Sequence, residues 1–190
     1  NLEPNLGSRV MAAGHVVQVV STTSKSHQSH GTTTFAHFSG LDCTITPTSA
    51  NSKIFVSVNI FIGNTDNDNY NQFIVYRQEA GGSNVSLDVG DVTGGSARVS
   101  WGQSGPYTHA VYEVHNSSWQ NLDSPNTTLA TTYKLYGRPH ATQNRTMFLN
   151  RPSNVDDSNR ISTVSAMTLM DVAQLQAYSK STTHNRQLWV

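Results

Sequence analysis

The stretch KIFVSVNIFIG, residues 53–63, decides the fold class of this chain. Its aliphatic side chains recur at every second position: Ile54, Val56, Val58, Ile60 and Ile62. A period of two places them on one face of a β-strand, against a core. Phe55 and Phe61 lie on the opposite face, which is therefore expected to be partly covered as well.

On both sides of this stretch, the chain shows further short strand patterns separated by turn residues. Strands are expected over 15–20, 35–46 (with a break at 39–40), 70–78, 85–89, 97–101, 109–115, 131–136, 145–150 and 161–172. Turns are expected at 47–52 and 102–106, where Pro, Gly, Ser and Asn gather. About ten strands at this spacing predict an all-β fold, a sandwich or barrel of antiparallel strands.

The two ends of the chain lack this pattern. Residues 1–14 carry no hydrophobic period, and residues 174–190 carry only a faint helical one. We expect an N-terminal arm or linker at 1–14, a single β-sandwich domain at 15–173 and a C-terminal extension at 174–190.

Composition narrows the class of protein. Charged residues make up 13% of the 190 residues and the formal net charge is +0, so no basic face for nucleic acid is expected. Solubility must come from hydroxyl and amide groups, which is typical of secreted and viral shell proteins; an intracellular β domain with few charges is the alternative. No run approaches the roughly 20 apolar residues of a membrane-spanning helix. The single cysteine, Cys43, excludes a disulfide within the chain and is expected in the core.

Four segments, in their order, match a known kind of domain. They are GHVVQVVSTT (14–23), Gly40-Leu41 through TITPTSANSKIFV (44–56), RTMFLNR (145–151) and RISTVSAMTLMDVA (160–173). Together they resemble a domain at the C-terminal end of tail fibres and other virion structural proteins of bacteriophages, notably marine ones. The resemblance spans residues 14–173, is most specific in TPTSANSKIFV, and is absent from the central region 64–130.

This resemblance implies a jelly-roll-like, homotrimeric fibre tip in the virion that mediates attachment to the host surface. The target would be a glycan or protein on the host cell, bound by loops 64–72 and 81–106. The alternative is a head-fibre, decoration or collar protein with a purely structural role. In either case residues 1–14 and 174–190 are expected to contact other virion proteins, without membrane insertion.

Four aromatic residues are the candidates for ligand binding. They lie in or beside loops rich in Gly and Asn: Trp101, Tyr107, Tyr112 and Trp119. Exposed rings among amides and hydroxyls suit sugar stacking or protein contacts. The alternative is that the two tryptophans belong to the core or to a subunit interface.

No catalytic motif emerges, so the chain is not expected to be an enzyme or to hold a cofactor. A polysaccharide depolymerase would need a pair of carboxylates, for which Glu79, Glu113 and Asp123 are the candidates. Metal binding has two faint candidates. His27 and His30 sit between flexible Ser-rich flanks, and the spacing of Asp66 and Asp68 starts a calcium loop that Tyr70 and Asn71 do not continue. No metal site is expected.

Overall fold

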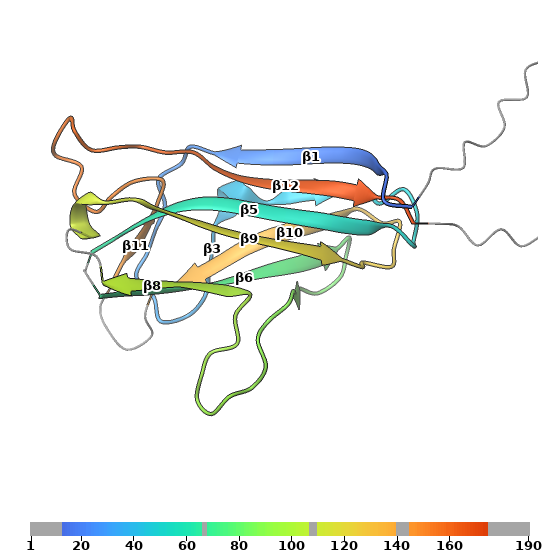
Figure 1. The fold of residues 1–190 in the computed structure, drawn as a ribbon, viewed down its shortest axis with the longest axis horizontal. Helices are drawn as coiled ribbons and strands as arrows, with labels where there is room; N and C mark the ends of the chain where they lie inside the picture. Colours follow the sequence, from blue (N-terminus) through green and yellow to red (C-terminus); the bar gives the residue numbers. More distant parts are fainter. Residues whose placement is uncertain (1–12, 66–67, 107–109, 140–144, 175–190) are drawn as a thin grey trace, which may run out of the picture.

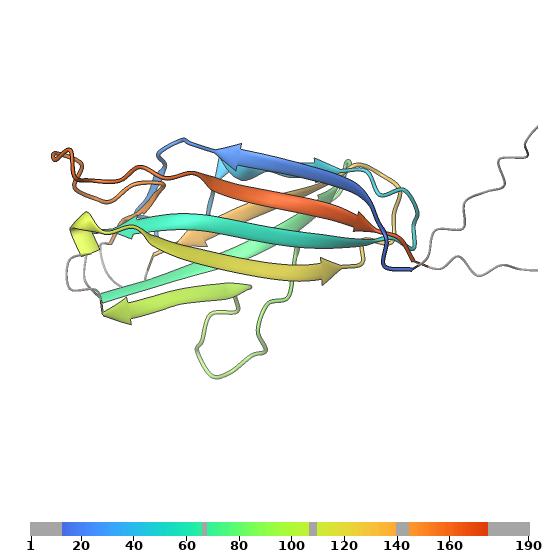
Figure 2. The ribbon, with the colours of Figure 1, turned by 45° about the horizontal axis from the view of Figure 1, so that its top comes forward.

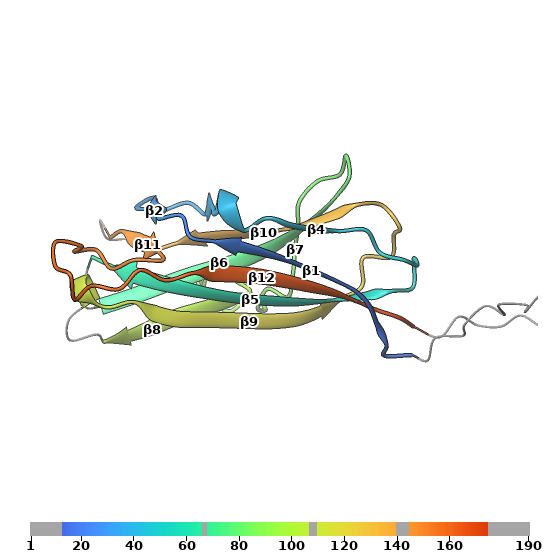
Figure 3. The same ribbon diagram turned by 90° about the horizontal axis from the view of Figure 1, so that it is seen from above.

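The computed structural model describes residues 13–65, 68–106, 110–139 and 145–174. These residues form two antiparallel β-sheets packed face to face, whose strands run along the length of the domain (Figure 3). Most of the expected arm (1–14) and extension (174–190) lies outside the described residues, so the predicted domain boundaries remain predictions.

The first sheet has six strands. Short strands that lie end to end beside the same neighbour are counted as one row, so this sheet has four rows. Its strands are β1 (Val16–Ser24), β2 (Ser29–His30), β5 (Lys53–Asn64), β9 (His115–Asp123), β11 (Met147–Leu149) and β12 (Ser165–Val172). β12 and β11 pair in succession with one edge of β5, while β9 pairs with the other edge. β1 and β2 continue in the same way along β12 and β11.

The second sheet repeats this arrangement. Its strands are β3 (Ala36–His37), β4 (Cys43–Ile45), β6 (Asp68–Glu79), β7 (Val85–Ser86), β8 (Trp101–Pro106) and β10 (Thr131–Arg138). β10 pairs with β6 on one edge and with β4 and β3 on the other. β8 and β7 share the far edge of β6. Short 3-10 turns lie at Ser39–Leu41 (η1) and Ala110–Tyr112 (η2).

The strand order identifies the sandwich as a jelly roll. Counted along the chain, the rows are β1/β2, β3/β4, β5, β6, β7/β8, β9, β10 and β11/β12. The first sheet then has the order 1-8-3-6 and the second 2-7-4-5, which is the double Greek key of a jelly roll. The predicted all-β, jelly-roll-like sandwich is confirmed; its described part has 12 strands, against about ten expected.

The core lies between the sheets and confirms the pattern from which the sequence analysis began. The alternate side chains of β5 from Ile54 to Ile62 are completely buried, whereas Phe55 and Phe61 on the outer face are partly covered. Cys43 is also in the core, as expected, and burial raises the pKa of its thiol.

Several expected boundaries were wrong, including those of the strands expected over 85–89 and 97–101, of which only Val85–Ser86 and Trp101 are strand. β1 continues past Val20 to Ser24, because its hydroxyl residues still pair with β12. Residues 102–106 are not a turn but most of β8, an edge strand in which Gly and Pro disturb no central ladder. The strand expected over 109–115 lies instead at His115–Asp123, preceded by η2. Its hydrophobic period is weak because β9 too is an edge strand, with polar residues facing solvent.

Asn150 closes a break in the first sheet. β11 ends at Leu149 and β12 starts at Ser165, so the row beside β5 is interrupted there. The backbone N–H of Asn150 donates to the Phe61 carbonyl at 2.8 Å, while Ser165 Oγ accepts from Phe61 N–H at 3.1 Å. Asn150 Nδ2 donates to the carbonyls of Ser24 and Ser26, and its Oδ1 accepts from Ser165 Oγ at 2.6 Å. One completely buried side chain thus replaces the missing ladder between three rows.

Replacing Asn150 should destabilise the fold strongly. Asn150→Ala removes the side-chain donor to the carbonyls of Ser24, which is buried, and Ser26, and forces Ala into a left-handed backbone at φ 64°, so we expect the free energy of unfolding to fall by about 3–4 kcal/mol. Asn150→Gly should cost about 1 kcal/mol less, because Gly accepts this φ. Urea denaturation measures both changes.

Asn126 provides the control, because it is also left-handed (φ 56°) but exposed. Asn126→Ala should cost about 1 kcal/mol, the strain alone. Equal losses in Asn126→Ala and Asn150→Ala would show that the buried hydrogen bonds contribute nothing.

Candidate functional site

Two of the four predicted ligand-binding aromatics lie together, along one long side of the sandwich. Trp101 of β8 stacks on Phe73 at 4.8 Å and on Trp119 of β9 at 5.9 Å between ring centroids. Trp101 Nε1 donates to Ser117 Oγ at 2.8 Å. β8 and β9 are edge rows of opposite sheets and run side by side (Figure 1). The two half-buried tryptophans pack against the core and close this side, as the alternative interpretation expected.

Tyr112 is placed apart from these two tryptophans. Tyr112 lies in η2, 40% exposed, with the Arg160 guanidinium 4.0 Å above its ring. The segment before Arg160 is tied to the same turn, because Asn154 N–H donates to the Val111 carbonyl at 2.8 Å. Tyr107 lies outside the described residues. The ligand-binding role of all four residues stays a prediction.

Of the faint metal candidates, the structure describes the two histidines. His27 is exposed, whereas His30 packs edge-on against Phe38 at 4.4 Å between ring centroids. Burial, and secondarily the nearby His37, hold the pKa of His30 below its ordinary value. Asp66 and the side chain of Asp68 lie outside the described part. Among the described residues, no three His, Cys, Asp or Glu side chains are grouped to hold a metal ion.

One of the three candidate acids instead joins the two sheets. Asp123 ends β9 in the first sheet and accepts hydrogen bonds from Arg77 Nη1 at 2.8 and 3.0 Å and from Tyr133 Oη at 2.8 Å, both in the second sheet. Tyr133 is completely buried; burial, and then the Asp123 carboxylate, raise its pKa far above the ordinary value. Sequence reasoning singled out Asp123 but missed its partners, because Arg77 and Tyr133 belong to other strands.

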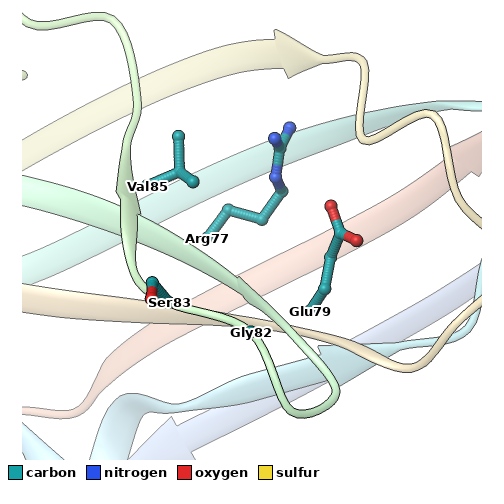
Figure 4. A pocket seen from close by; sticks show the side chains of 5 residues that line it. All are labelled: Arg77, Glu79, Gly82, Ser83 and Val85. Atoms are coloured by element: carbon teal, nitrogen blue, oxygen red, sulfur yellow. The ribbon is translucent and has the colours of Figure 1, made fainter.

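The other two candidate acids make different contacts from Asp123. Glu113 directly follows η2 in the chain, and its Oε2 lies 3.1 Å from His115 Nε2. Glu79 lines a pocket of about 220 Å³ with Arg77, Gly82, Ser83 and Val85. Figure 4 shows Arg77 and Glu79 projecting from β6 beside the strand that carries Val85. Arg77, which lines this pocket beside Glu79, is also the residue that donates to Asp123.

A second aromatic group, missed by the sequence analysis, lies on the outer face of the second sheet. His37 stacks on Tyr136 at 4.8 Å, and Tyr136 meets the ring of Tyr76 at 4.9 Å. Arg138 lies 4.6 Å above Phe35. The alternation in TTYKLYGR, residues 131–138, could have revealed this face. The rings of this face already contact one another across the strands, so each ring has a packing partner within the domain.

The segment between β7 and β8 projects from the second sheet. Ser100 fastens its base, since Ser100 Oγ accepts from Val75 N–H at 3.1 Å and donates to the Leu87 carbonyl at 2.7 Å. The residues between, Asp88–Val99, leave the body of the sandwich (Figures 1 and 2) and expose 74% of Val92. This projecting loop falls within the predicted binding region 81–106.

Within the described ranges, no helix has the length and apolarity needed to cross a membrane.

Removing Asp123 should be costly, because Arg77 and Tyr133 would lose their buried partner. We expect Asp123→Ala to lower the free energy of unfolding by about 3–5 kcal/mol. Tyr133→Phe should cost about 1–2 kcal/mol, since it removes one hydrogen bond. Urea denaturation tests both, with Glu113→Ala in a more exposed ion pair as the control, expected within about 1 kcal/mol of wild type. A loss in Glu113→Ala as large as in Asp123→Ala would contradict this assignment.

Acid should weaken the fold through His30. Because its pKa is lower in the fold than in the unfolded chain, protonation favours unfolding. Its stabilising contribution is complete above the unfolded pKa of about 6.5 and is lost as pH falls through the lower folded pKa. His30→Leu should therefore flatten the decline in unfolding free energy below pH 6.5 or so, whereas His27→Gln at an exposed site should leave it unchanged. Identical pH profiles for wild type and His30→Leu would exclude His30 as the cause.

Comparison with known proteins adds no family. No protein-family model matches the chain, and no curated protein matches it. The TNF protein Eiger of S. frugiperda shares 12% identity at a TM-score of 0.42, over 88% of this chain and 94% of its own. Structures of infectious bursal disease virus, strains Gt and Gx, share 8% and 7% identity at TM-scores of 0.47 and 0.44, over 92% and 90% of this chain. The chain covers only 42% and 45% of those viral chains. These likenesses concern the fold alone, and the jelly-roll assignment rests on the strand order.

Proposed function

We propose that this chain is a bacteriophage virion structural protein whose β domain forms a homotrimeric fibre tip and attaches the particle to the host surface. The role is one of structure and binding rather than catalysis. The observation that carries the proposal is spatial. The segments that resemble phage fibre domains, although up to 150 residues or so apart in the chain, contribute strands to neighbouring rows of the first sheet, and part of the segment that ends at residue 56 forms η1 and β4.

Three of these segments pair in succession, while the fourth, 145–151, supplies β11, which pairs with residues 62–64 of β5 beyond the segment 44–56. The segment 14–23 supplies most of β1, which pairs with β12 from the segment 160–173. β12 pairs with the start of β5, and β11, from 145–151, pairs with its end. A resemblance made of scattered fragments would have no reason to fall on adjacent strands, so this clustering supports a shared structural unit.

The two most specific segments are also joined by a side-chain clamp. Thr48, in TPTSANSKIFV, donates from its backbone N–H and its hydroxyl to Asp171 Oδ2, at 2.7 and 2.8 Å. Asp171 is completely buried near the end of β12. The turn and the last strand are therefore constrained together, which explains why both belong to one recognisable pattern.

The region without the resemblance, 64–130, builds the parts that differ from this unit. It supplies β6 to β9 and the projecting loop Asp88–Val99. The two ends of the described domain lie together elsewhere, because Gly14 N–H donates to the Ala173 carbonyl and Ala173 N–H to the His15 carbonyl, both at 2.8 Å. An anchored pair of ends with a variable loop away from them suits a domain that is held by one part and binds with another.

Host adsorption tests the proposal. The purified protein should compete with phage particles for host cells, and Val92→Asp in the projecting loop should weaken this competition about tenfold, the loss of one central apolar contact. Val155→Asp is the matched control, since Val155 is also an exposed valine but lies in another segment.

Failure to bind host cells would contradict the attachment role. If deleting residues 1–14 also removed the protein from particles, the head-fibre, decoration or collar alternative would replace it.

A further inference from the structure

The outer face of the first sheet is almost free of charge. The side chains that alternate with its buried positions belong to four rows: Val16, Val19, Ser21 and Thr23 of β1; Ala166, Thr168, Met170 and Val172 of β12; Lys53, Phe55, Ser57, Asn59 and Phe61 of β5; and Asn116, Ser118, Gln120 and Leu122 of β9. Lys53, at the first position of β5, is the one charged member of this set. The outer face of the second sheet differs, since it carries Asp42, Lys134 and Arg138.

The register places an apolar row across this face. Val19 lies opposite Met170, Met170 opposite Phe55, and Phe55 opposite Leu122. This line of apolar side chains therefore runs perpendicular to the strands and crosses β1, β12, β5 and β9. Its two ends are exposed, Val19 by 56% and Leu122 by 46%.

Hydroxyl and amide groups border this row. One step along each strand pair, Ser21 lies opposite Thr168 and Ser57 opposite Gln120. Ser21 and Thr168 share a hydrogen bond of 3.0 Å between their hydroxyls. An apolar centre with an uncharged polar margin is the composition of a protein interface, in which charged residues are depleted from the core.

We propose that the outer face of the first sheet is an interface between copies of this chain. A second copy is the occupant that fits, because a face on which Lys53, at its margin, is the one charge among the outward side chains of β1, β5, β9 and β12 meets its own copy with little like-charge repulsion and little charge to desolvate. An acidic or basic partner would find little complementary charge on it.

Strand addition at the sheet edges is the less suitable mode of association. The edge strand β9 lies along β8 and is closed by the seam of Trp101 and Trp119. At the other edge, Thr22 of β1 donates its hydroxyl to the Asp42 carbonyl at 2.9 Å. Covered edges discourage pairing with a further strand, so the open face is the surface that remains for contact.

The size of the face sets the expected strength. Four rows about 4.8 Å apart and about eight residues long at 3.4 Å per residue cover roughly 500 Å² before side-chain relief is counted. Stable specific interfaces bury about 600–1,000 Å² per partner, so a face of this size falls below that range and fits a weak contact. Association is therefore expected to depend on concentration in the micromolar range.

This inference does not require the attachment function, because a structural virion protein would use the same contact. Failure of host adsorption and failure of self-association are separate results, read from separate measurements.

Sedimentation equilibrium of the full chain tests the interface. Between about 1 and about 100 µM, the average mass of the wild type should rise to at least twice the monomer mass. Val19→Lys and Leu122→Lys should remain monomeric across this range. Val85→Lys and Leu129→Lys, at similarly exposed residues away from this face, should behave as the wild type. A monomeric wild type, or unchanged assembly in Val19→Lys and Leu122→Lys, would overturn the proposal.

A thiol probe tests the same contact without adding charge. Cys43 is buried, so a cysteine introduced by Val19→Cys would be the reactive thiol of the native protein. Its reaction with a thiol reagent should slow several-fold as protein concentration rises, whereas the thiol of Val85→Cys should react at a constant rate. Equal behaviour of the two variants would exclude the face as an interface.

Discussion

The need of β5 for a hydrogen-bonding partner along its entire length governs the first sheet. This strand runs through twelve residues, with β9 on one edge and no single strand long enough to cover the other. β12 and β11 divide that edge, and the backbone of Phe61 falls between them. Asn150 and Ser165 supply the hydrogen bonds that the interruption removes, so the segment between them can leave the sheet without exposing unpaired backbone groups to the core.

The two sheets are held together by polar contacts as well as by the apolar core. Asp123 reaches from the first sheet to Arg77 and Tyr133 of the second. Thr48 and Asp171 join the turn before β5 to the end of β12. Directional contacts of this kind are useful in a sandwich of strands, because they oppose sliding of the sheets, which hydrophobic burial alone resists only weakly.

The two outer faces of the sandwich differ in chemistry. On the second sheet, aromatic and charged side chains pair with their neighbours across the strands, so their interactions are completed within the domain. On the first sheet, hydroxyl and amide groups pair across the strands beside an apolar row whose two ends, Val19 and Leu122, are exposed. A fibre tip built from several copies needs one surface for its own copies and another for its target. The first sheet and the projecting loop Asp88–Val99 offer two such separate places for the proposed function.

Residues 53–63 show what the sequence alone could determine. Five aliphatic residues at a period of two predicted a buried strand face, and the same period placed Cys43 in the core, because alternation along one strand is a local property of the chain. β8 and β9 were misplaced because edge strands face solvent and need no apolar alternation.

Only the tertiary structure could decide the contacts that join strands. Asp123 meets Arg77 and Tyr133, Asn150 meets Ser24, and Val19, Phe55, Leu122 and Met170 form one row, through pairings of strands far apart in the chain. A strand's pattern shows which of its residues face outward, but the register between strands sets which of them are neighbours. Register depends on the packing of all the rows together, so it is not written in any one segment.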